Sequence, residues 1–168
     1  MTLVIYDIEN IKTSDNSKTN KDSKKFDLLE LREKIESKIE DNDFKHVLFM
    51  ALTSEGTFRF KDFMMYHGFD VITKKGLKKK NKFNGVSYEY YDNDIDAKIV
   101  TYCMQYGCNY DNIVLVSGDG DMSNLVKYLL DCAYVTVCSW KDNLSYKLIN
   151  IAHQYVYIED LLKGESNE

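Results

Sequence analysis

Proline is absent from this sequence of 168 residues, and tryptophan occurs once. There is also no internal repeat and no linker-like stretch, so we expect one domain, of a size that buries a full core. No apolar run is long enough to cross a membrane as a helix. The opening residues, MTLVIYDIEN, are too short and too acidic for a secretory signal. These absences predict a cytoplasmic protein.

Several common site patterns are missing as well. No G-x-x-x-x-G-K-[ST] or G-x-G-x-x-G loop is present, which argues against a nucleotide cofactor. The histidines are scattered and accompany no zinc pattern, and the cysteines form no C-x-x-C pair. These residues are His46, His67 and His153, and Cys103, Cys108, Cys132 and Cys138. We interpret the cysteines as reduced, mostly buried thiols rather than zinc ligands or disulfides.

The overall charge balance is that of an acidic globular protein. Hydrophobic residues make up 44% of the chain and charged residues 29%, and the net charge is −5. A protein of this charge does not simply coat nucleic acid, because phosphate repels it. A local basic patch remains compatible with the composition.

Short apolar runs alternate with helical patterns along most of the chain. We expect strands at residues 3–6, 46–52, 69–73, 112–118, 134–140 and 155–158, and helices at 26–41, 56–68, 96–107, 121–132 and 143–154. This alternation is typical of an α/β fold with a mostly parallel sheet and helices on both faces. Residues 12–25 are predicted to form a mobile polar loop, and residues 74–91 a basic loop.

Acidic residues follow two of the predicted strands. Asp7 comes directly after residues 3–6, and Asp119 and Asp121 come directly after residues 112–118. The carboxyl ends of parallel strands meet at one sheet edge, where ligands of such folds bind. Asp94 and Asp96 open the helix that leads into the second of these strands. If the first and fourth strands are neighbours, these acids converge.

Clustered carboxylates need a proton or a cation to offset their repulsion. Two charges about 5 Å apart repel by roughly 3 kcal/mol at an effective dielectric of about 20. Hard oxygen ligands select Mg²⁺ or Mn²⁺, either of which can activate water beside a phosphoryl group. Plainer roles are also open, since Asp94 or Asp96 could cap one helix and Asp121 the next.

Three motifs together resemble those of NYN domains, a branch of the PIN-like nuclease superfamily. VIYDIENI resembles the opening D-x-x-N motif, and NDIDAKIV resembles the central K-G-x-D helix start. VLVSGDGDMSNLVKYL is similar to the S-G-D-x-D motif, the most specific of the three, and SYKLINIAHQYVYI resembles the last helix and strand. The likeness covers nearly the whole chain in the family's order.

The resemblance implies a fold, a reaction and a site. The fold would be a PIN-like three-layer sandwich with strand order 3-2-1-4-5, and the reaction would be metal-dependent cleavage of single-stranded RNA. The implied metal ligands are Asp7, Asp96, Asp119 and Asp121, with Asp94 as the alternative to Asp96. Asn10 would orient a water, a ligand or a phosphate, and Ser117 would support the acidic loop. Pairing into a homodimer is also open, because PIN-like edges and helices often pair.

Two departures from the family pattern keep other functions in view. Asn93 replaces the lysine before the central acid, and His153 stands where an acid is often found. They favour a non-catalytic RNA-binding or regulatory module. A haloacid-dehalogenase-like phosphatase is a further alternative suggested by GDGD, although Glu9 stands where that group has aspartate.

The basic loop is a second candidate site. It has six lysines in nine residues, followed by aromatic side chains. The residues concerned are Lys74, Lys75, Lys78, Lys79, Lys80 and Lys82, then Phe83, Tyr88, Tyr90 and Tyr91. Lysines bind phosphates without sequence preference, and aromatic rings such as that of Tyr90 stack on unpaired bases. The loop leads into the acidic helix start, so we expect it to guide RNA; the alternative is a solvated loop.

Overall fold

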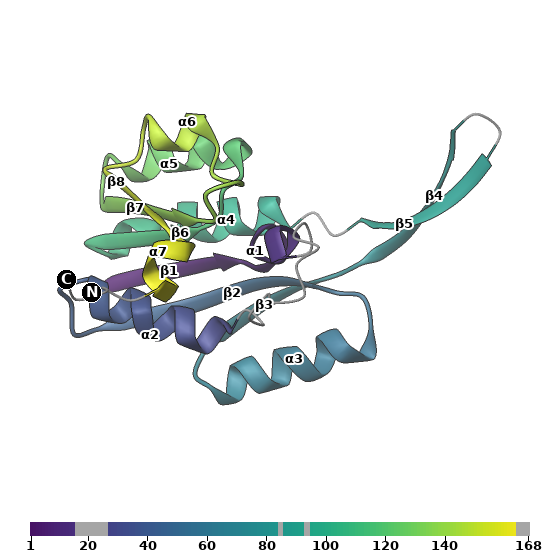
Figure 1. Ribbon diagram of the computed structural model, residues 1–168, viewed down its shortest axis with the longest axis horizontal. Helices are drawn as coiled ribbons and strands as arrows, with labels where there is room; N and C mark the ends of the chain where they lie inside the picture. Colours follow the sequence, from purple (N-terminus) through teal and green to yellow (C-terminus); the bar gives the residue numbers. More distant parts are fainter. Residues whose placement is uncertain (16–26, 84–85, 93–94, 164–168) are drawn as a thin grey trace.

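The computed structural model describes residues 1–15, 27–83, 86–92 and 95–163, with only the backbone described at 12–15, 77–83 and 86–92. A six-stranded sheet lies between two layers of helices (Figure 1). Its strands, all parallel, are β3 (Asp70–Lys75), β2 (Phe44–Leu52), β1 (Thr2–Asp7), β6 (Asn112–Val116), β7 (Tyr134–Ser139) and β8 (Gln154–Tyr157), in that order across the sheet. The predicted α/β sandwich and the order 3-2-1-4-5 are confirmed, and β8 adds a sixth strand.

The central strands are apolar throughout because both faces of the sheet are covered. Leu3 and Ile5 belong to one core and Val4 and Tyr6 to the other. The first core is closed by α4 (Asp96–Tyr106), η2 (Gly120–Met122), α5 (Ser123–Leu129) and α6 (Tyr146–Ile149). The second is closed by α1 (Ile8–Asp15), α2 (Leu28–Lys38), α3 (Glu55–Tyr66) and α7 (Ile158–Lys163). A short 3-10 turn, η1 (Gly107–Asn109), follows α4. None of the described helices is long and apolar enough to cross a membrane.

The basic segment is a hairpin, so the loop prediction for residues 74–91 is wrong. β3 runs to Lys75, and β4 (Leu77–Phe83) then pairs antiparallel with β5 (Val86–Asp92). The hairpin extends away from the body, and its base lies at the same end of the sheet as α1 (Figure 1). The sequence therefore builds an arm here.

The polar segment expected as a mobile loop at 12–25 begins as a helix. Helix α1 runs to Asp15, and Ile8 and Ile11 anchor its first part in the second core. Residues 16–26 lie outside the described residues, so the remainder of that prediction stays a prediction.

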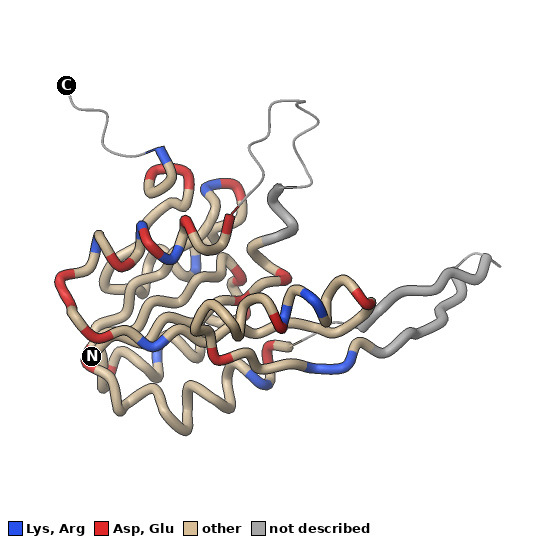
Figure 2. The backbone as a smooth tube through the Cα atoms, turned by 90° about the horizontal axis from the view of Figure 1, so that it is seen from below, with Lys and Arg blue, Asp and Glu red and all other residues tan. Residues whose placement is uncertain are grey.

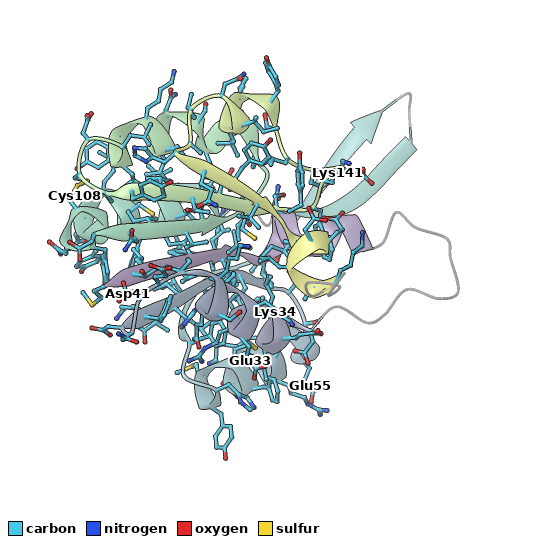
Figure 3. The ribbon with its side chains drawn as sticks, turned by 60° about the vertical axis from the view of Figure 1, so that its left-hand side comes forward. Glu33, Lys34, Asp41, Glu55, Cys108 and Lys141 are labelled. Atoms are coloured by element: carbon cyan, nitrogen blue, oxygen red, sulfur yellow. A yellow bond between two sulfur atoms is a disulfide. The ribbon has the colours of Figure 1, made fainter. Side chains whose placement is uncertain are left out.

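Two of the cysteines form a disulfide, so the prediction of four reduced thiols is wrong for them. Cys108 lies just after α4 and Cys132 just after α5, and these two helices pack on each other. The packing brings the two Cα atoms to 5.3 Å. Figure 3 shows Cys108 at the end of the molecule opposite the hairpin. Cys103 and Cys138 are buried thiols, as predicted, and burial raises the pKa of each to about 12.

A buried histidine links the sheet to α2. The hydroxyl of Tyr6 lies 3.0 Å from Nδ1 of His46, and His46 Nε2 lies 2.8 Å from a Glu36 carboxylate oxygen. A neutral imidazole with its proton on Nε2 suits both contacts, because Tyr6 can then donate to Nδ1. Burial, together with the charge of Arg32, lowers the pKa of His46 to about 4, although Glu36 opposes this.

Acidification should therefore weaken the fold before the carboxylates titrate. The unfolded chain takes up a proton on His46 near pH 6.5, whereas the folded chain does so only near pH 4. Stability is thus fully present above about pH 6.5 and falls as the pH drops towards 4. We expect urea unfolding to show a loss of about 1–2 kcal/mol between pH 7 and pH 5. This loss should shrink in His46→Gln and persist in Phe44→Leu; an equal loss in both variants would contradict the assignment.

Candidate active site

The site begins where two central strands end side by side. Register pairs Tyr6 of β1 with Val116 of β6, so the next residues, Asp7 and Ser117, emerge together. The Ser117 hydroxyl donates to Asp7 Oδ2 at 2.9 Å, and both residues are buried. The first predicted acid is thus held across the strand pair by the serine of the third motif.

Asp7 is a carboxyl group in an unfavourable place for charge. It is 3% exposed, and burial is the main cause of its raised pKa. Hydrogen bonds from the Ser117 hydroxyl and the Asn10 backbone N–H oppose the rise, while the negative charges of Asp119 and Glu9 add to it. A nearby cation would favour the ionised form.

Asp119 and Asp121 lie on the turn after β6. The backbone N–H of Asp119 donates to Ser117 Oγ at 3.3 Å, so this serine connects Asp119 to Asp7. Asp119 Oδ1 accepts from the Asp121 N–H at 2.9 Å and caps η2. The suggestion that Asp121 caps the following helix is wrong, because Met122 is the cap residue of α5 and makes no side-chain bond. The Asp121 side chain is exposed.

Asn10 holds the acidic turn in place. Its Oδ1 accepts from the Gly118 N–H at 2.8 Å, and its backbone carbonyl accepts from Asn143 Nδ2 at 3.4 Å. In the next residue, Ile11, the carbonyl accepts from Trp140 Nε1 at 2.8 Å. The first motif, the third motif and the segment after β7 therefore form one hydrogen-bonded unit.

Gly118 leaves no room for a side chain. A Cβ atom there would lie 2.4 Å from the Asn143 carbonyl oxygen and 2.4 Å from Ser139 Oγ. The Gly118 carbonyl also accepts from the Ser145 N–H at 3.0 Å, so the turn is packed and bonded against the same segment. The sequence did not predict this contact, because the partners of Gly118 lie at the end of β7 and just after it and belong to no motif.

We therefore expect Gly118→Ala to destabilise the fold strongly. The clash is with a backbone carbonyl that is itself held by neighbouring bonds, and overpacking of this kind costs about 1–3 kcal/mol or more. Thermal melting should show the loss, and Gly56→Ala is the matched control. Gly56 lies in the first turn of α3, where an added Cβ would lie 3.7 Å from Ser54 Oγ, so alanine there should be neutral or stabilising. Equal melting points for the two variants would contradict this account.

The structure does not bring all the predicted acids into one cluster. Asp96 is the first residue of α4, whose cap residue is Ile95 without a side-chain bond, so capping by Asp96 is wrong. Asp94 and Asn93 lie outside the described residues. Among the acids, histidines and cysteines that are described, no three form a group that could hold a metal ion. The proposed ligand set therefore stays a prediction.

His153 lies far from the acids in the fold. It precedes β8, at the amino ends of the parallel strands, whereas Asp7 lies at a carboxyl end. Its Nδ1 accepts from the Val135 N–H at 3.0 Å, and its ring stacks on Tyr134. The departure from the family pattern at His153 therefore does not alter the site.

The basic segment begins at the same edge of the sheet as the acids and continues out along the hairpin (Figure 1). Lys74 and Lys75 end β3, at the carboxyl edge of the sheet. Lys78, Lys79, Lys80 and Lys82 lie in β4, and Tyr90 lies opposite Lys79 in β5. Only the backbone positions of these hairpin residues are described, and α4 with Asp96 follows shortly after β5.

Comparisons with known proteins identify the family and the fold of this chain. The family profile of the NYN domain matches residues 1–159. The low amplitude and bright protein LabA of Synechococcus elongatus is 29% identical over 103 residues, which is 61% of this chain and 55% of that protein. The match thus spans about half the length of that relative. A protein of unknown function from Vibrio parahaemolyticus has the same fold, with a TM-score of 0.72, 22% identity, and coverage of 95% of this chain and 93% of that chain.

Proposed function

Since this chain belongs to the NYN domain family, generally nucleases, we propose that it is a metal-dependent endoribonuclease that hydrolyses phosphodiester bonds in single-stranded RNA. The observation that carries the proposal is the link from Asp7 through Ser117 to Asp119 at the carboxyl edge of the sheet. A buried acid with a raised pKa beside a second acid is the arrangement expected of a functional site.

The chemistry of these residues fits a hard divalent ion. Carboxylate oxygens are the ligands that Mg²⁺ and Mn²⁺ prefer. The residues that would hold the ion are Asp7, Asp119, Asp121 and either Asp96 or Asp94. When bound, such an ion lowers the pKa of water and offsets charge on the phosphoryl group.

The surrounding residues have positioning roles in this proposal. Ser117 fixes one oxygen of Asp7, which restricts how that carboxylate can turn. Asn10 and Asn143 fix the turn that carries Asp119. Because Gly118 is packed against the Asn143 carbonyl, this turn cannot shift easily. The acids are therefore preorganised by their neighbours, which favours attack from one direction.

The hairpin supports RNA as the substrate. Residues 74–92 carry six lysines and two acids, a net charge of +4, which leaves −9 for the rest of the chain. The arm is thus the part of this acidic protein that attracts a polyanion. RNA held on the arm would bring a phosphodiester to the acids at its base. We also propose a cytoplasmic location, where the arm would meet single-stranded RNA.

Removing charge from the arm should weaken RNA binding. We expect alanine at Lys78, Lys79 and Lys80 to lower the slope of log affinity against log salt by up to about two units, at roughly 0.7 per phosphate contact on single strands. Fluorescence anisotropy with a labelled oligonucleotide measures this slope. Alanine at Lys38, Lys127 and Lys163, all exposed on the body, is the control of equal charge. If the slope is unchanged in the arm variant, these lysines do not contact phosphates and the segment is only a solvated surface.

Incubation with mixed single-stranded RNA and DNA, in Mn²⁺ and in chelator, tests the proposed reaction directly. We expect internal cleavage of RNA in Mn²⁺ and none in chelator. Binding without cleavage would favour the RNA-binding alternative. A covalent aspartyl phosphate would favour the phosphatase, which family membership does not support.

A further inference from the structure

Helix α3 has an unusually apolar exterior. Its twelve residues, EGTFRFKDFMMY, include one fully buried side chain, Met64. Phe58, Phe63 and Met65 are 49–53% exposed and Tyr66 is 86% exposed. A surface helix normally presents polar residues on its solvent side, so large apolar side chains exposed on both flanks of α3 indicate a further packing partner. Exposed aromatic and methionine side chains are also enriched at protein interfaces.

The charges of α3 favour a protein partner over nucleic acid. Glu55, Arg59, Lys61 and Asp62 give the helix a net charge of zero. Viewed from the side of α3, both basic and acidic residues are present along the chain (Figure 2). A phosphate backbone would need a basic surface. Two acidic copies of this chain, in contrast, meet with least repulsion at a neutral surface.

The charged residues of α3 are also complementary to themselves. Glu55, Arg59, Asp62 and Tyr66 follow one another at helical spacing along the side away from Met64. Two α3 helices can lie antiparallel so that the twofold axis passes between residues 60 and 61 of each. Arg59 of one copy then faces Asp62 of the other. Tyr66 then faces Glu55 of the second copy. The match occurs twice, as twofold symmetry requires.

Apolar residues flank this row in the same arrangement. Phe58 and Met65, seven residues apart, lie on one side of the row. In the antiparallel pair, Phe58 comes next to Met65 of the second copy, again twice. Within one chain the charged residues pair locally, Arg59 with Glu55 and Lys61 with Asp62. Such exposed pairs are weak and can exchange for contacts with a second copy.

We propose that α3 is the contact surface of a twofold homodimer of this chain. The partner is a second copy, with the two helices antiparallel and Arg59 of each opposite Asp62 of the other. This proposal rests on α3 alone and is independent of the nuclease site, which lies at the strand ends.

Charge reversal across the twofold axis tests the proposal. Sedimentation of the wild type from about one to a few hundred micromolar should show a monomer–dimer equilibrium. Arg59→Glu and Asp62→Arg, each alone, should raise the dimer dissociation constant at least about tenfold, because like charges then face each other. The double variant Arg59→Glu/Asp62→Arg restores opposite charges in both contacts and should recover most of the affinity.

Apolar variants complete the experiment. Phe58→Ser with Met65→Ser should also yield monomers, whereas Tyr128→Ser, at a 42% exposed position on α5, should not. Circular dichroism melts verify folding of each variant. A wild type that stays monomeric throughout, or a double charge variant as weak as the single ones, would overturn the proposal. The proposal would also be overturned if the Phe58/Met65 variant lost binding to labelled single-stranded RNA while its oligomeric state stayed the same.

Discussion

Asp119→Asn is expected to abolish most RNA cleavage in Mn²⁺ while melting at or above the wild type in chelator. The charge of Asp119 is one cause of the raised pKa of Asp7, so removing it relieves a repulsion in the folded state. The amide oxygen of asparagine can still accept the Asp121 N–H bond that Asp119 Oδ1 accepts at 2.9 Å. The cap of η2 is therefore kept while the charge is lost.

The stabilisation by Mn²⁺ should be smaller in Asp119→Asn than in the wild type, although the variant is at least as stable in chelator. An ion that binds only the folded chain stabilises it by about 2.7 kcal/mol at a hundredfold excess over its dissociation constant. The wild type should show such a shift in Mn²⁺, and Asp119→Asn should show less because a charged ligand is gone. Cleavage should fall by about a hundredfold or more, the usual cost of losing a group that stabilises developing charge.

A matched variant separates site effects from net charge. Asp131 is exposed in the turn after α5, at the edge opposite the site, and Asp131→Asn makes the same charge change. It should leave both cleavage and the Mn²⁺ shift unaltered. If Asp119→Asn is less stable than the wild type in chelator, and neither protein responds to Mn²⁺, then Asp119 is a structural acceptor. If the wild type does not cleave RNA in Mn²⁺, the nuclease proposal fails and RNA binding without catalysis is the remaining function.

The sheet was predictable because its local pattern and its environment agree. The runs LVIY and IVLV are continuously apolar, which only a strand buried on both faces requires, and both lie in the centre of the sheet. The strand order depended on the family resemblance, since apolar runs alone do not say which strands are neighbours. Once β1 and β6 are adjacent, the meeting of Asp7 and Ser117 follows from the register.

The hairpin was missed because lysine content outweighed a turn signal. Asn84-Gly85 between β-branched and aromatic residues is a strong hairpin sequence. The run of lysines, in contrast, is typical of a solvated loop. The disulfide was missed for a different reason: Cys108 and Cys132 are 24 residues apart, and only the packing of α4 on α5 brings them together. The contacts of Gly118 with Asn143 likewise arise from tertiary packing.

Asp7→Asn is expected to stabilise the protein near neutral pH, and the gain should vanish in acid. The pKa of Asp7 is raised from 3.8 in the folded chain, chiefly by burial. The folded state therefore holds a proton that the unfolded chain releases, and stability is lost as the pH rises from 3.8 through the folded pKa. Asparagine has no such titration. Urea unfolding at several pH values should show the advantage of the variant growing with pH, together with a smaller Mn²⁺ shift than in the wild type.

Asp41 provides the control of opposite sign. The side chain of Asp41 accepts bonds from the Thr2 hydroxyl at 2.7 Å and from the Asp43 N–H at 3.1 Å, and these bonds hold its pKa well below 3.8. Figure 3 shows Asp41 at the end of the molecule opposite the hairpin, and its side chain is 15% exposed. Its contribution to stability is present above pH 3.8 and is lost as the pH falls through the folded pKa. Asp41→Asn should therefore be less stable than the wild type at neutral pH, with a deficit that shrinks in acid. If both variants change stability with pH in the same direction, net charge alone explains them, and Asp7 is not a strained site acid.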